Sequence, residues 1–319
     1  MNAKINALSA ANSAQAVRTK VMNFIKRFFL YGIVNILVIL TISILMRVFG
    51  IEPYLRANGI DYVSLLQFCL LWGMFGSLFS LFTSRIMAKL MMGVKLIDPR
   101  TSDMQQAKLV SMVHRLAQQA GLPAMPEVGY YVSDEVNAFA TGPTRSRALV
   151  AVSTGLVKSM NWDQIEGVLG HEISHVANGD MVTMTLVQGI INAIVMFLAR
   201  VISFFLMNRG RDSNSSPRNS YLLTHILEIV LSFLGMIVVN WFSRVREYKA
   251  DEGSARLAGR DKMISALQAL GGQIAYADLT EHKSLATLKI SGVPSKLSRL
   301  FSTHPSLEDR IENLRKKDF

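Results

Sequence analysis

Two histidines and a glutamate within five residues are the side chains of this sequence best suited to chemistry. His171, Glu172 and His175 stand in the pattern H-E-x-x-H. On a helix, the two imidazoles lie one above the other on one face and can occupy adjacent corners of a zinc tetrahedron. Glu172 then reaches a water at the metal as a general base. The pattern predicts a Zn²⁺ hydrolase site, with two surface histidines at helical spacing as the alternative.

The surrounding residues predict a helix that holds these side chains rigidly. Asn161 is suited to the N-cap, and Gln164 stands three residues later in the capping-box position. Apolar residues recur at helical spacing through the segment, and Asn178 with Gly179 provides a stop or a kink. The pattern therefore lies in the body of a helix, as the rigidity of a metal site requires.

A third metal ligand is expected after the last long apolar run. Catalytic zinc commonly takes three protein ligands and leaves one position for water. Glu247 and Asp251 lie one helical turn apart within residues 246–251. Glu247 would complete a set of two histidines and one glutamate, and Asp251 could accept a hydrogen bond from a ligand histidine. The alternative is an ordinary charged helix face beside a membrane.

Long apolar runs dominate the rest of the chain, in which 50% of 319 residues are hydrophobic and 18% are charged. Two runs without charged side chains, 28–46 and 62–83, are each long enough to cross a bilayer. Two further runs, 181–207 and 221–242, contain a few ionisable residues. The sequence therefore predicts about four transmembrane helices in two hairpins.

Charged residues inside the third and fourth runs need partners, because an unpaired charge in hydrocarbon is costly. In an antiparallel hairpin, Arg200 and Glu228 fall at the same depth on facing helices, which predicts an ion pair. Alternatively, these charged residues line a polar path to the active site, or the two runs are only partly embedded in the membrane. Because the histidines precede this hairpin and Glu247 follows it, the hairpin returns the chain to the same membrane surface.

The net charge of +11 is distributed as in a membrane protein. Residues 1–27 carry five basic and no acidic side chains, and a second basic cluster at 85–100 follows the second run. This asymmetry places the N-terminus and the catalytic domain in the cytoplasm and argues against nucleic acid as a partner. The basic residues at 209–218 do not follow this rule. With Cys69 as the single cysteine, neither a disulfide framework nor a thiolate zinc site is expected.

The expected fold class is a mainly α-helical membrane protein with a cytoplasmic α+β zincin-like metalloprotease domain. Runs at 128–132 and 149–152 are rich in β-branched or aromatic residues and predict two strands of a small sheet. The expected order is a basic mobile tail at 1–27, a hairpin at 28–83, catalytic parts at 84–180 and 243–319, and the second hairpin at 181–242 between them.

From roughly Phe28 onward the chain resembles the HtpX membrane zinc metalloproteases, of the family that also contains the CAAX prenyl endopeptidases. The resemblance is carried by the two N-terminal runs, the H-E-x-x-H pattern with Asn178-Gly179-Asp180, the hairpin and residues 247–251. It implies that His171, His175 and Glu247 bind one Zn²⁺ and that Glu172 is the general base.

The resemblance also implies roles for further residues. Asn137, Ala138, Phe139 and Ala140 match a stretch beside the substrate cleft, although Phe139 is equally suited to plain core. His304, before Pro305, and Arg310 match a late element near the catalytic centre. His304 could donate to the oxyanion, cap the zinc in a resting state, or be structural. Asp180, Asp251 and Arg310 are expected to support the ligands.

The implied function is cleavage of misfolded or damaged membrane proteins, or of unfolded polypeptides, on the cytoplasmic side of a bacterial inner membrane. The resemblance also implies a role in stress response and quality control, with self-cleavage and cooperation with other quality-control proteases. A prenyl-protein endopeptidase is the nearest alternative, but four spans are too few for a chamber that accepts a lipidated tail. A membrane scaffold with structural zinc is a further alternative, against which stands Glu172, because a structural site does not need it.

Overall fold

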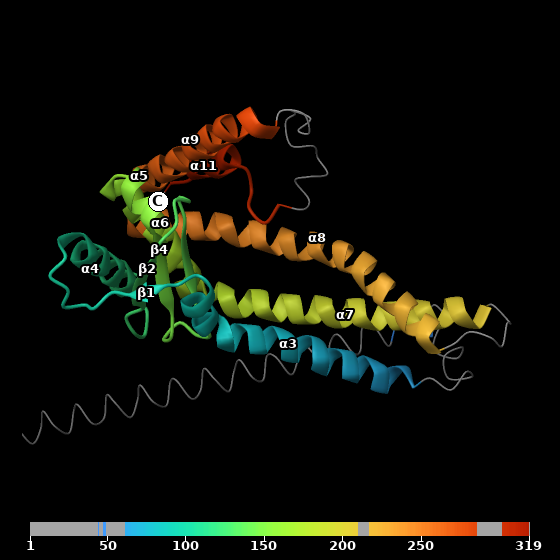
Figure 1. Cartoon of the computed structure of the whole chain (residues 1–319). Helices are drawn as coiled ribbons and strands as arrows, with labels where there is room; N and C mark the ends of the chain where they lie inside the picture. The colour runs from blue at the N-terminus through green and yellow to red at the C-terminus, as the bar shows by residue number, and fades with distance from the viewer. Residues whose placement is uncertain (1–43, 45–46, 49–60, 210–216, 286–301, 319) are drawn as a thin grey trace, which may run out of the picture. The chain divides into compact units, whose positions relative to one another are not determined.

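The computed structural model describes residues 44, 47–48, 61–209, 217–285 and 302–318 (Figure 1). Two compact units, Met1–Trp72 and Gly73–Phe319, make up the chain, and their boundary falls inside helix α3 (Tyr62–Met91). The predicted tail at 1–27 and nearly all of the predicted span at 28–46 lie outside the described residues.

A four-stranded sheet, in the order β1-β2-β4-β3, lies in the second unit. β2 (Glu127–Tyr131) and β4 (Leu149–Ser153) pair in parallel at the centre. At the two edges, β1 (Lys95–Leu96) pairs antiparallel with β2, and β3 (Ala138–Thr141) pairs antiparallel with β4. The two predicted strands are confirmed as the central pair. β4 is buried along its whole length, as its small and β-branched residues favour.

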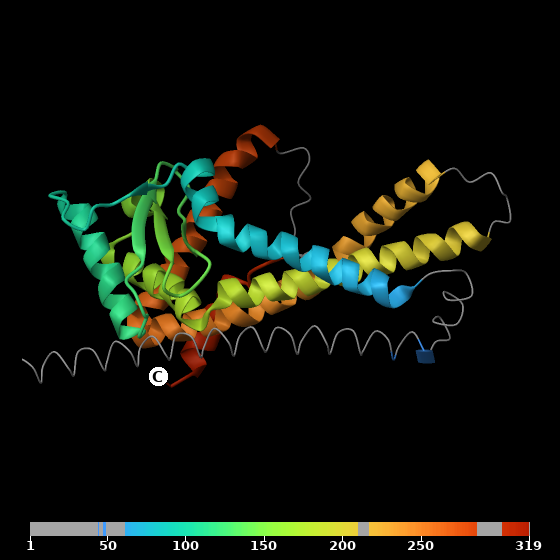
Figure 2. The same ribbon diagram turned by 90° about the horizontal axis from the view of Figure 1, so that it is seen from below.

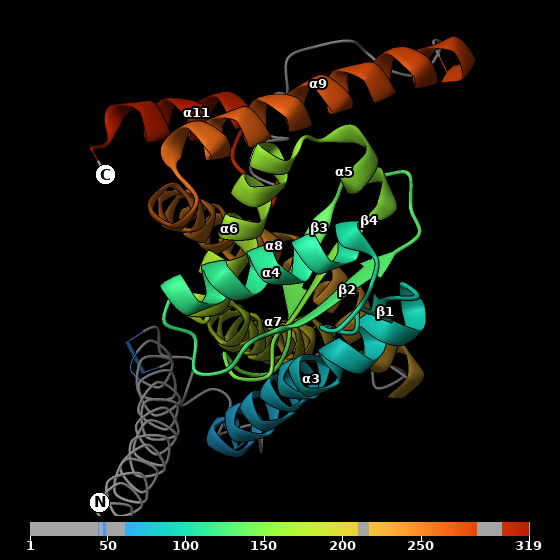
Figure 3. The same cartoon turned by 90° about the vertical axis from the view of Figure 1, so that its left-hand side faces the viewer.

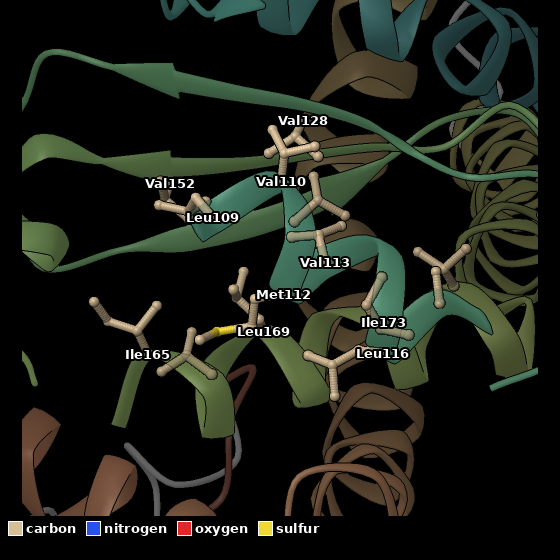
Figure 4. Packing of buried hydrophobic residues seen from close by; sticks show 14 of the residues in the cluster. Leu109, Val110, Met112, Val113, Leu116, Val128, Val152, Ile165, Leu169 and Ile173 are labelled. Carbon is tan, nitrogen blue, oxygen red and sulfur yellow. The ribbon is translucent and has the colours of Figure 1, made fainter. Parts of the chain in front are cut away.

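One face of the sheet packs on α4 (Met104–Gln119) and α6 (Trp162–Asn178) in the main hydrophobic core (Figures 3 and 4). Asp103 caps α4 by accepting hydrogen bonds from two backbone N–H groups of its first turn. Leu169 and Ile173 of α6 are fully buried in this core. Because this face of α6 is packed in the core, the opposite face of the helix has a fixed position relative to the sheet.

Helix α6 begins and ends where the sequence predicts. Asn161 Oδ1 accepts a hydrogen bond from the Gln164 N–H at 2.9 Å, and Gln164 Oε1 accepts one from the Asn161 N–H at 3.1 Å. This is a complete capping box. Gly179 ends the helix at φ 74°, a left-handed conformation that is accessible to glycine. Helix α7 (Asp180–Arg209) starts at the next residue, so one glycine makes the bend.

Helices α7 and α8 (Pro217–Leu257) form an antiparallel hairpin (Figures 1 and 2). Arg200 Nη1 donates to Glu228 Oε1 at 2.8 Å, which confirms the predicted ion pair. α8 extends beyond the apolar run at 221–242 because no proline or glycine stands at 243–252. The helix that leaves the hairpin therefore carries Glu247 without a break.

Three described helices are long and apolar enough to cross a membrane, at Tyr62–Met91, Asp180–Met207 and Tyr221–Leu257. Large apolar side chains on these helices are exposed, among them Phe79 and Phe233. Such extensive apolar surfaces are rare on proteins in water and are normal against lipid. The fold is a mainly α-helical membrane protein with a small mixed sheet, as predicted.

Helices α6 and α8 approach each other closely in the part of α8 that follows its apolar run. A Cβ atom at Gly253 would lie 2.4 Å from Ser174 Oγ, so only glycine fits there without a shift. Ser254 Oγ donates to the Gly167 carbonyl oxygen at 2.7 Å across the same contact. This contact brings the H-E-x-x-H helix against the helix that carries Glu247.

Two further helices close this part of the molecule. α9 (Arg260–Leu285) packs on α6, and α11 (Leu307–Lys316) packs on α9 and α8 (Figure 3). α5 (Thr154–Ser159) follows β4 directly and is capped by Ser153. Residues far apart in the sequence therefore surround one end of α6.

Candidate metal centre

His171, His175 and Glu247 converge between α6 and α8, and their ligand atoms all lie within 4.8 Å of one another. The two Nε2 atoms are 3.1 Å apart, and each is 3.3 Å from an oxygen of Glu247. A tetrahedral zinc site with bonds of about 2.0–2.1 Å has edges of about 3.3–3.4 Å between ligand atoms. The three side chains are therefore spaced as ligands of a single ion.

The chemistry of this group also fits a cation. Glu247 is 1% exposed, yet its Oε1 accepts no hydrogen bond of normal geometry from the described residues. A buried carboxylate oxygen without a donor is costly. A metal ion between the carboxylate and the two ring nitrogens would satisfy all three groups, so the site could hold one.

The other ring nitrogen of each histidine faces a carboxylate. His171 Nδ1 is 2.9 Å from Asp251 Oδ1, and His175 Nδ1 is 2.6 Å from Asp180 Oδ2. An N–H donated from Nδ1 fixes the tautomer that leaves the Nε2 lone pair for a metal. Both aspartates expected to support the ligands thus contact them, one from α8 and one from the first residue of α7.

The carboxylates determine the protonation of the metal-free histidines. Burial lowers the pKa of both imidazoles, but the neighbouring carboxylates outweigh it. Asp251 and Glu247 raise the pKa of His171, and Asp180 and Glu247 raise the pKa of His175 to about 9. Because a metal binds only the unprotonated nitrogen, metal binding at neutral pH displaces protons from this group.

Two arginines reach the centre from different helices. Arg310 of α11 is 6% exposed and donates to both oxygens of Asp251, at 2.6 and 2.8 Å. Arg246, for which the sequence suggested no role, lies 3.8 Å from Glu247 Oε1. Its buried Nε has no acceptor among the described residues. Adjacent residues on a helix do not share a face, so the position of Arg246 beside Glu247 was no signal.

The formal charges around the ligand nitrogens are unequal. Four carboxylates lie here against two guanidinium groups, and the excess of two negative charges matches one divalent cation. The groups are Glu172, Asp180, Glu247, Asp251, Arg246 and Arg310.

Glu172 and His304 line a cavity of about 150 Å³ together with His171 and Glu247. His304 Nδ1 donates to Glu247 Oε2 at 2.8 Å, and 59% of its side chain is exposed. Arg244 Nη1 donates to the Ser302 carbonyl oxygen at 2.7 Å, which ties the His304 segment to α8. His304 thus contacts Glu247, the expected third metal ligand, directly.

The stretch expected beside the substrate divides between two environments. Asn137 and Ala138 line the cavity. Phe139 packs in a second apolar cluster against Tyr131, with ring centroids 5.7 Å apart, and Ala140 packs on the main core. Because side chains alternate between the faces of a strand, Phe139 points away from its two neighbours.

Comparisons with known proteins agree with this geometry. Residues 103–318 match peptidase family M48. The chain is 49% identical to the Protease HtpX homolog of Bacillus licheniformis over 299 residues, which cover 92% of this chain and 99% of that relative. It is 44% identical to Protease HtpX of Acinetobacter baumannii over 298 residues, with the same two coverages.

The crystal structure of S. mikatae Ste24p has a similar fold, with a TM-score of 0.56 and 18% sequence identity. The likeness covers 86% of this chain and 64% of Ste24p. Nearly full-length relatives, a family match that includes every residue of the metal centre, and helices able to cross a bilayer lead to one conclusion: the chain belongs to peptidase family M48 and is a membrane-bound metallopeptidase.

Proposed function

We propose that the protein is a zinc endopeptidase of the bacterial inner membrane that cuts misfolded or damaged membrane proteins and other unfolded polypeptides on the cytoplasmic side. The observation that carries the proposal is the convergence of His171, His175 and Glu247 at tetrahedral spacing, beside Glu172 in one cavity. Two imidazoles and a carboxylate suit Zn²⁺. A bound Zn²⁺ would polarise a peptide carbonyl and lower the pKa of a water.

The chain supplies the proton transfer and holds the ligands. Glu172 accepts a proton from the attacking water and delivers it to the leaving amine nitrogen. Asp180 and Asp251 keep the two histidine rings in one tautomer and orientation, and Arg310 holds Asp251 in turn.

His304 steadies Glu247 through the hydrogen bond from its Nδ1. A neutral imidazole that donates from Nδ1 has no hydrogen on Nε2, so donation to an oxyanion requires the imidazolium form. In that form His304, exposed at the cavity, has a second N–H for the negative charge that develops on the carbonyl oxygen.

Strand β3 offers an edge on which an extended substrate can lie. The Ser153 N–H donates to the Asn137 carbonyl oxygen, and Phe139 pairs with Ala151. Residues in an antiparallel pair alternate between bonding the partner and facing away, so Ala138 and Ala140 present their backbone N–H and C=O groups at the outer edge. Recognition through the backbone suits substrates that share no sequence.

The proposed orientation rests on the basic cluster at 85–100, which lies at and beyond the end of α3 and is typical of a cytoplasmic membrane surface. The resemblance to HtpX proteases supports self-cleavage, quality control during stress and cooperation with other membrane proteases. These substrates and partners are part of the same proposal.

The test is zinc-dependent cleavage of an unfolded model protein by the wild type, by Glu172→Gln and by the exposed control Glu135→Gln. The protein is purified in detergent with a chelator and reloaded with zinc. We expect Glu172→Gln to retain one zinc and to cut at least about 100-fold more slowly, because general acid–base catalysis contributes at least that factor.

Cleavage by Glu172→Gln at the wild-type rate would show that Glu172 is not the general base. An inactive wild type that holds one zinc, and unfolds when the zinc is removed, would support the scaffold with structural zinc instead.

A further inference from the structure

The loop between β3 and β4 carries two arginines whose charge the described part of the chain does not neutralise. These are Arg145, which is half-buried, and Arg147, which is exposed. Neither guanidinium group forms an ion pair or a hydrogen bond with a described residue. The neighbouring sequence adds no negative charge, because no acidic residue stands between Glu135 and Asp163. The loop therefore carries two uncompensated positive charges.

Two basic side chains at the end of α3 are paired instead. Arg85 and Lys89 both bind the carboxylate of Glu127, and Lys89 Nζ is 3.0 Å from its Oε2. A carboxylate shared in this way reduces the attraction of both side chains for a further anion. Arg145 and Arg147 are thus better placed than Arg85 and Lys89 to bind an anion.

The arginines stand in a closed turn. The Arg147 N–H donates to the Thr144 carbonyl oxygen at 3.0 Å, which closes a turn of four residues. Gly142 lies directly against the Arg147 carbonyl group, so the two ends of the loop are in contact. Thr144 Oγ1 and Ser146 Oγ are 3.2 Å apart. Four consecutive residues therefore carry two hydroxyl groups and two guanidinium groups in one fixed turn.

Arg145 reaches the bend between α6 and α7. Its Nε and Nη2 atoms lie 3.5 and 3.7 Å from the position that a Cβ atom of Gly179 would take. The Nε is buried without an acceptor among the described residues. Asp180, next to Gly179, binds His175 Nδ1 at 2.6 Å instead. The described part of the protein therefore offers this guanidinium group no acceptor, although a buried N–H normally has one.

The bend at Gly179 is also the place where the chain enters the membrane. The segment Asp180–Met207, long and apolar enough to cross a bilayer, starts at the next residue. A side chain in contact with Gly179 therefore lies at the level of the lipid headgroups, outside the hydrocarbon core. Headgroup phosphates are the anions present at this level.

The donors of the turn suit a phosphate group. A guanidinium group presents a planar fork that binds two phosphate oxygens at once, and hydroxyl groups can donate to the remaining oxygens. Two uncompensated positive charges favour a lipid with a net negative charge. In phosphatidylcholine, the ammonium group of the choline neutralises the phosphate, so such a lipid gains less.

We propose that the turn formed by Thr144, Arg145, Ser146 and Arg147 binds the phosphate of an anionic phospholipid. The bound lipid connects the β3–β4 loop to the start of α7 at the membrane surface. Because β3 ends one residue before this loop, the lipid fixes the distance between the sheet and the bilayer. This binding does not depend on the proposed peptide cleavage.

The experiment measures lipid binding to the full-length protein in detergent by native mass spectrometry. The protein is titrated with dioleoylphosphatidylglycerol or dioleoylphosphatidylcholine, and the apparent Kd of the first bound lipid is determined. The variants are Arg147→Gln and the double variant Arg145→Gln/Arg147→Gln. Arg256→Gln/Arg315→Gln is the matched control, because it removes two exposed arginines beyond the apolar run of α8 and on α11.

The wild type is expected to bind phosphatidylglycerol more tightly than phosphatidylcholine. Each arginine removed from the turn should weaken phosphatidylglycerol binding by about 5-fold, so the double variant should lose about 25-fold. Phosphatidylcholine binding should change little, and the control pair should bind both lipids as the wild type does. Arg147 is exposed, so Arg147→Gln alone keeps the test informative if the double variant does not fold.

Equal affinity of the wild type for the two lipids would overturn the site. An Arg147→Gln variant that binds phosphatidylglycerol like the wild type would do the same, as would an equal loss in the control pair. Inorganic phosphate is added in a separate series at the concentration of the lipid. If it displaces phosphatidylglycerol, the turn binds free phosphate and the assignment to a lipid is wrong.

Discussion

The two nitrogens of each histidine in the metal centre face different partners. Nε2 of His171 and of His175 points to the shared position with Glu247, while Nδ1 contacts an aspartate. A carboxylate that accepts from the outer nitrogen increases the basicity of the imidazole and orients its ring. Metal affinity at this site therefore depends on residues that do not touch the metal position.

The clearest prediction at the residue scale concerns Asp180. Asp180→Asn replaces the acceptor of the 2.6 Å contact with His175 Nδ1 by a neutral amide. Zinc affinity is expected to fall by about 10–100-fold, as is typical for such supporting residues. Competition with a coloured zinc chelator measures this change.

The control for this experiment is Asp163→Asn, near the start of α6, the helix that carries His175. At this position 71% of the aspartate side chain is exposed. We expect no change in zinc affinity for this variant. An unchanged affinity for Asp180→Asn would show that the contact does not support the ligand.

At this scale, the sequence was informative where one helix places the residues together. The separation of four residues predicts that His171 and His175 share a face, and the same spacing links Glu247 to Asp251. The direct contact of His304 with Glu247 depends on how distant segments pack, and no local periodicity encodes such a contact. Arg246 was not found for a different reason: it is next to Glu247 in the sequence, and adjacent residues on a helix do not share a face.

At the scale of elements, the close contact of α6 with α8 places the third ligand. Gly253→Ala puts a Cβ atom 2.4 Å from Ser174 Oγ, and Ser174 is buried, so the helices must move apart. We expect the free energy of unfolding to fall by about 1–3 kcal/mol, as for other overpacked cores, and zinc affinity to weaken because Glu247 moves away from the histidines.

The partner substitution Ser174→Gly removes the atoms that the new Cβ meets. The double variant Gly253→Ala/Ser174→Gly should therefore bind zinc as Ser174→Gly alone does. If the double variant binds zinc as weakly as Gly253→Ala, the loss has another cause than this contact.

A second contact between elements gives a pH dependence. Glu166 on α6 accepts hydrogen bonds from Arg115 of α4 at 2.7 Å and from Lys262 of α9 at 2.9 Å. Burial raises the pKa of Glu166, but the hydrogen bonds from Lys262 and Arg115 outweigh burial and lower the pKa below its usual 4.5. The interaction therefore stabilises the fold fully above pH 4.5 and is lost as the pH falls through the lowered pKa.

Glu166→Gln is expected to lower the free energy of unfolding at pH 7 by about 1.5–3 kcal/mol, the range for hydrogen bonds to charged groups. The difference from the wild type should shrink steadily below pH 4.5. Chemical unfolding in detergent at several pH values measures it, with the exposed Glu312→Gln as control. A difference that stays constant down to pH 3 would contradict the assignment.

The sequence predicted these elements where a strong local signal exists. The capping box and Gly179 delimit α6, and β-branched runs mark the two central strands. The short edge strands β1 and β3 carry little such signal, since their neighbours in the sheet determine their pairing. Hydropathy marks the membrane segment of α8 at 221–242 but not the end of the helix, which continues to Leu257.

At the scale of the whole molecule, the proposed orientation can be tested through the single cysteine. In a Cys69→Ser background, Lys316→Cys places a thiol on α11, the helix that carries Arg310, at a position where 71% of the native side chain is exposed. A membrane-impermeant maleimide should label it in inverted membrane vesicles and leave it unlabelled in intact cells. Labelling in intact cells would place the catalytic side outside, and permeabilised cells are the positive control.

The division of the metal centre between α6, α8 and α11 has a consequence for the order of biosynthesis. A nascent chain that has left the ribosome as far as α7 carries both histidines and Glu172 but neither Glu247 nor Arg310. The third ligand follows only after the α7–α8 hairpin, and the arginine that holds Asp251 follows later still. Translation must therefore pass the hairpin before the ligand set is complete, so peptide-bond cleavage cannot begin while the first half of the enzyme is still being made.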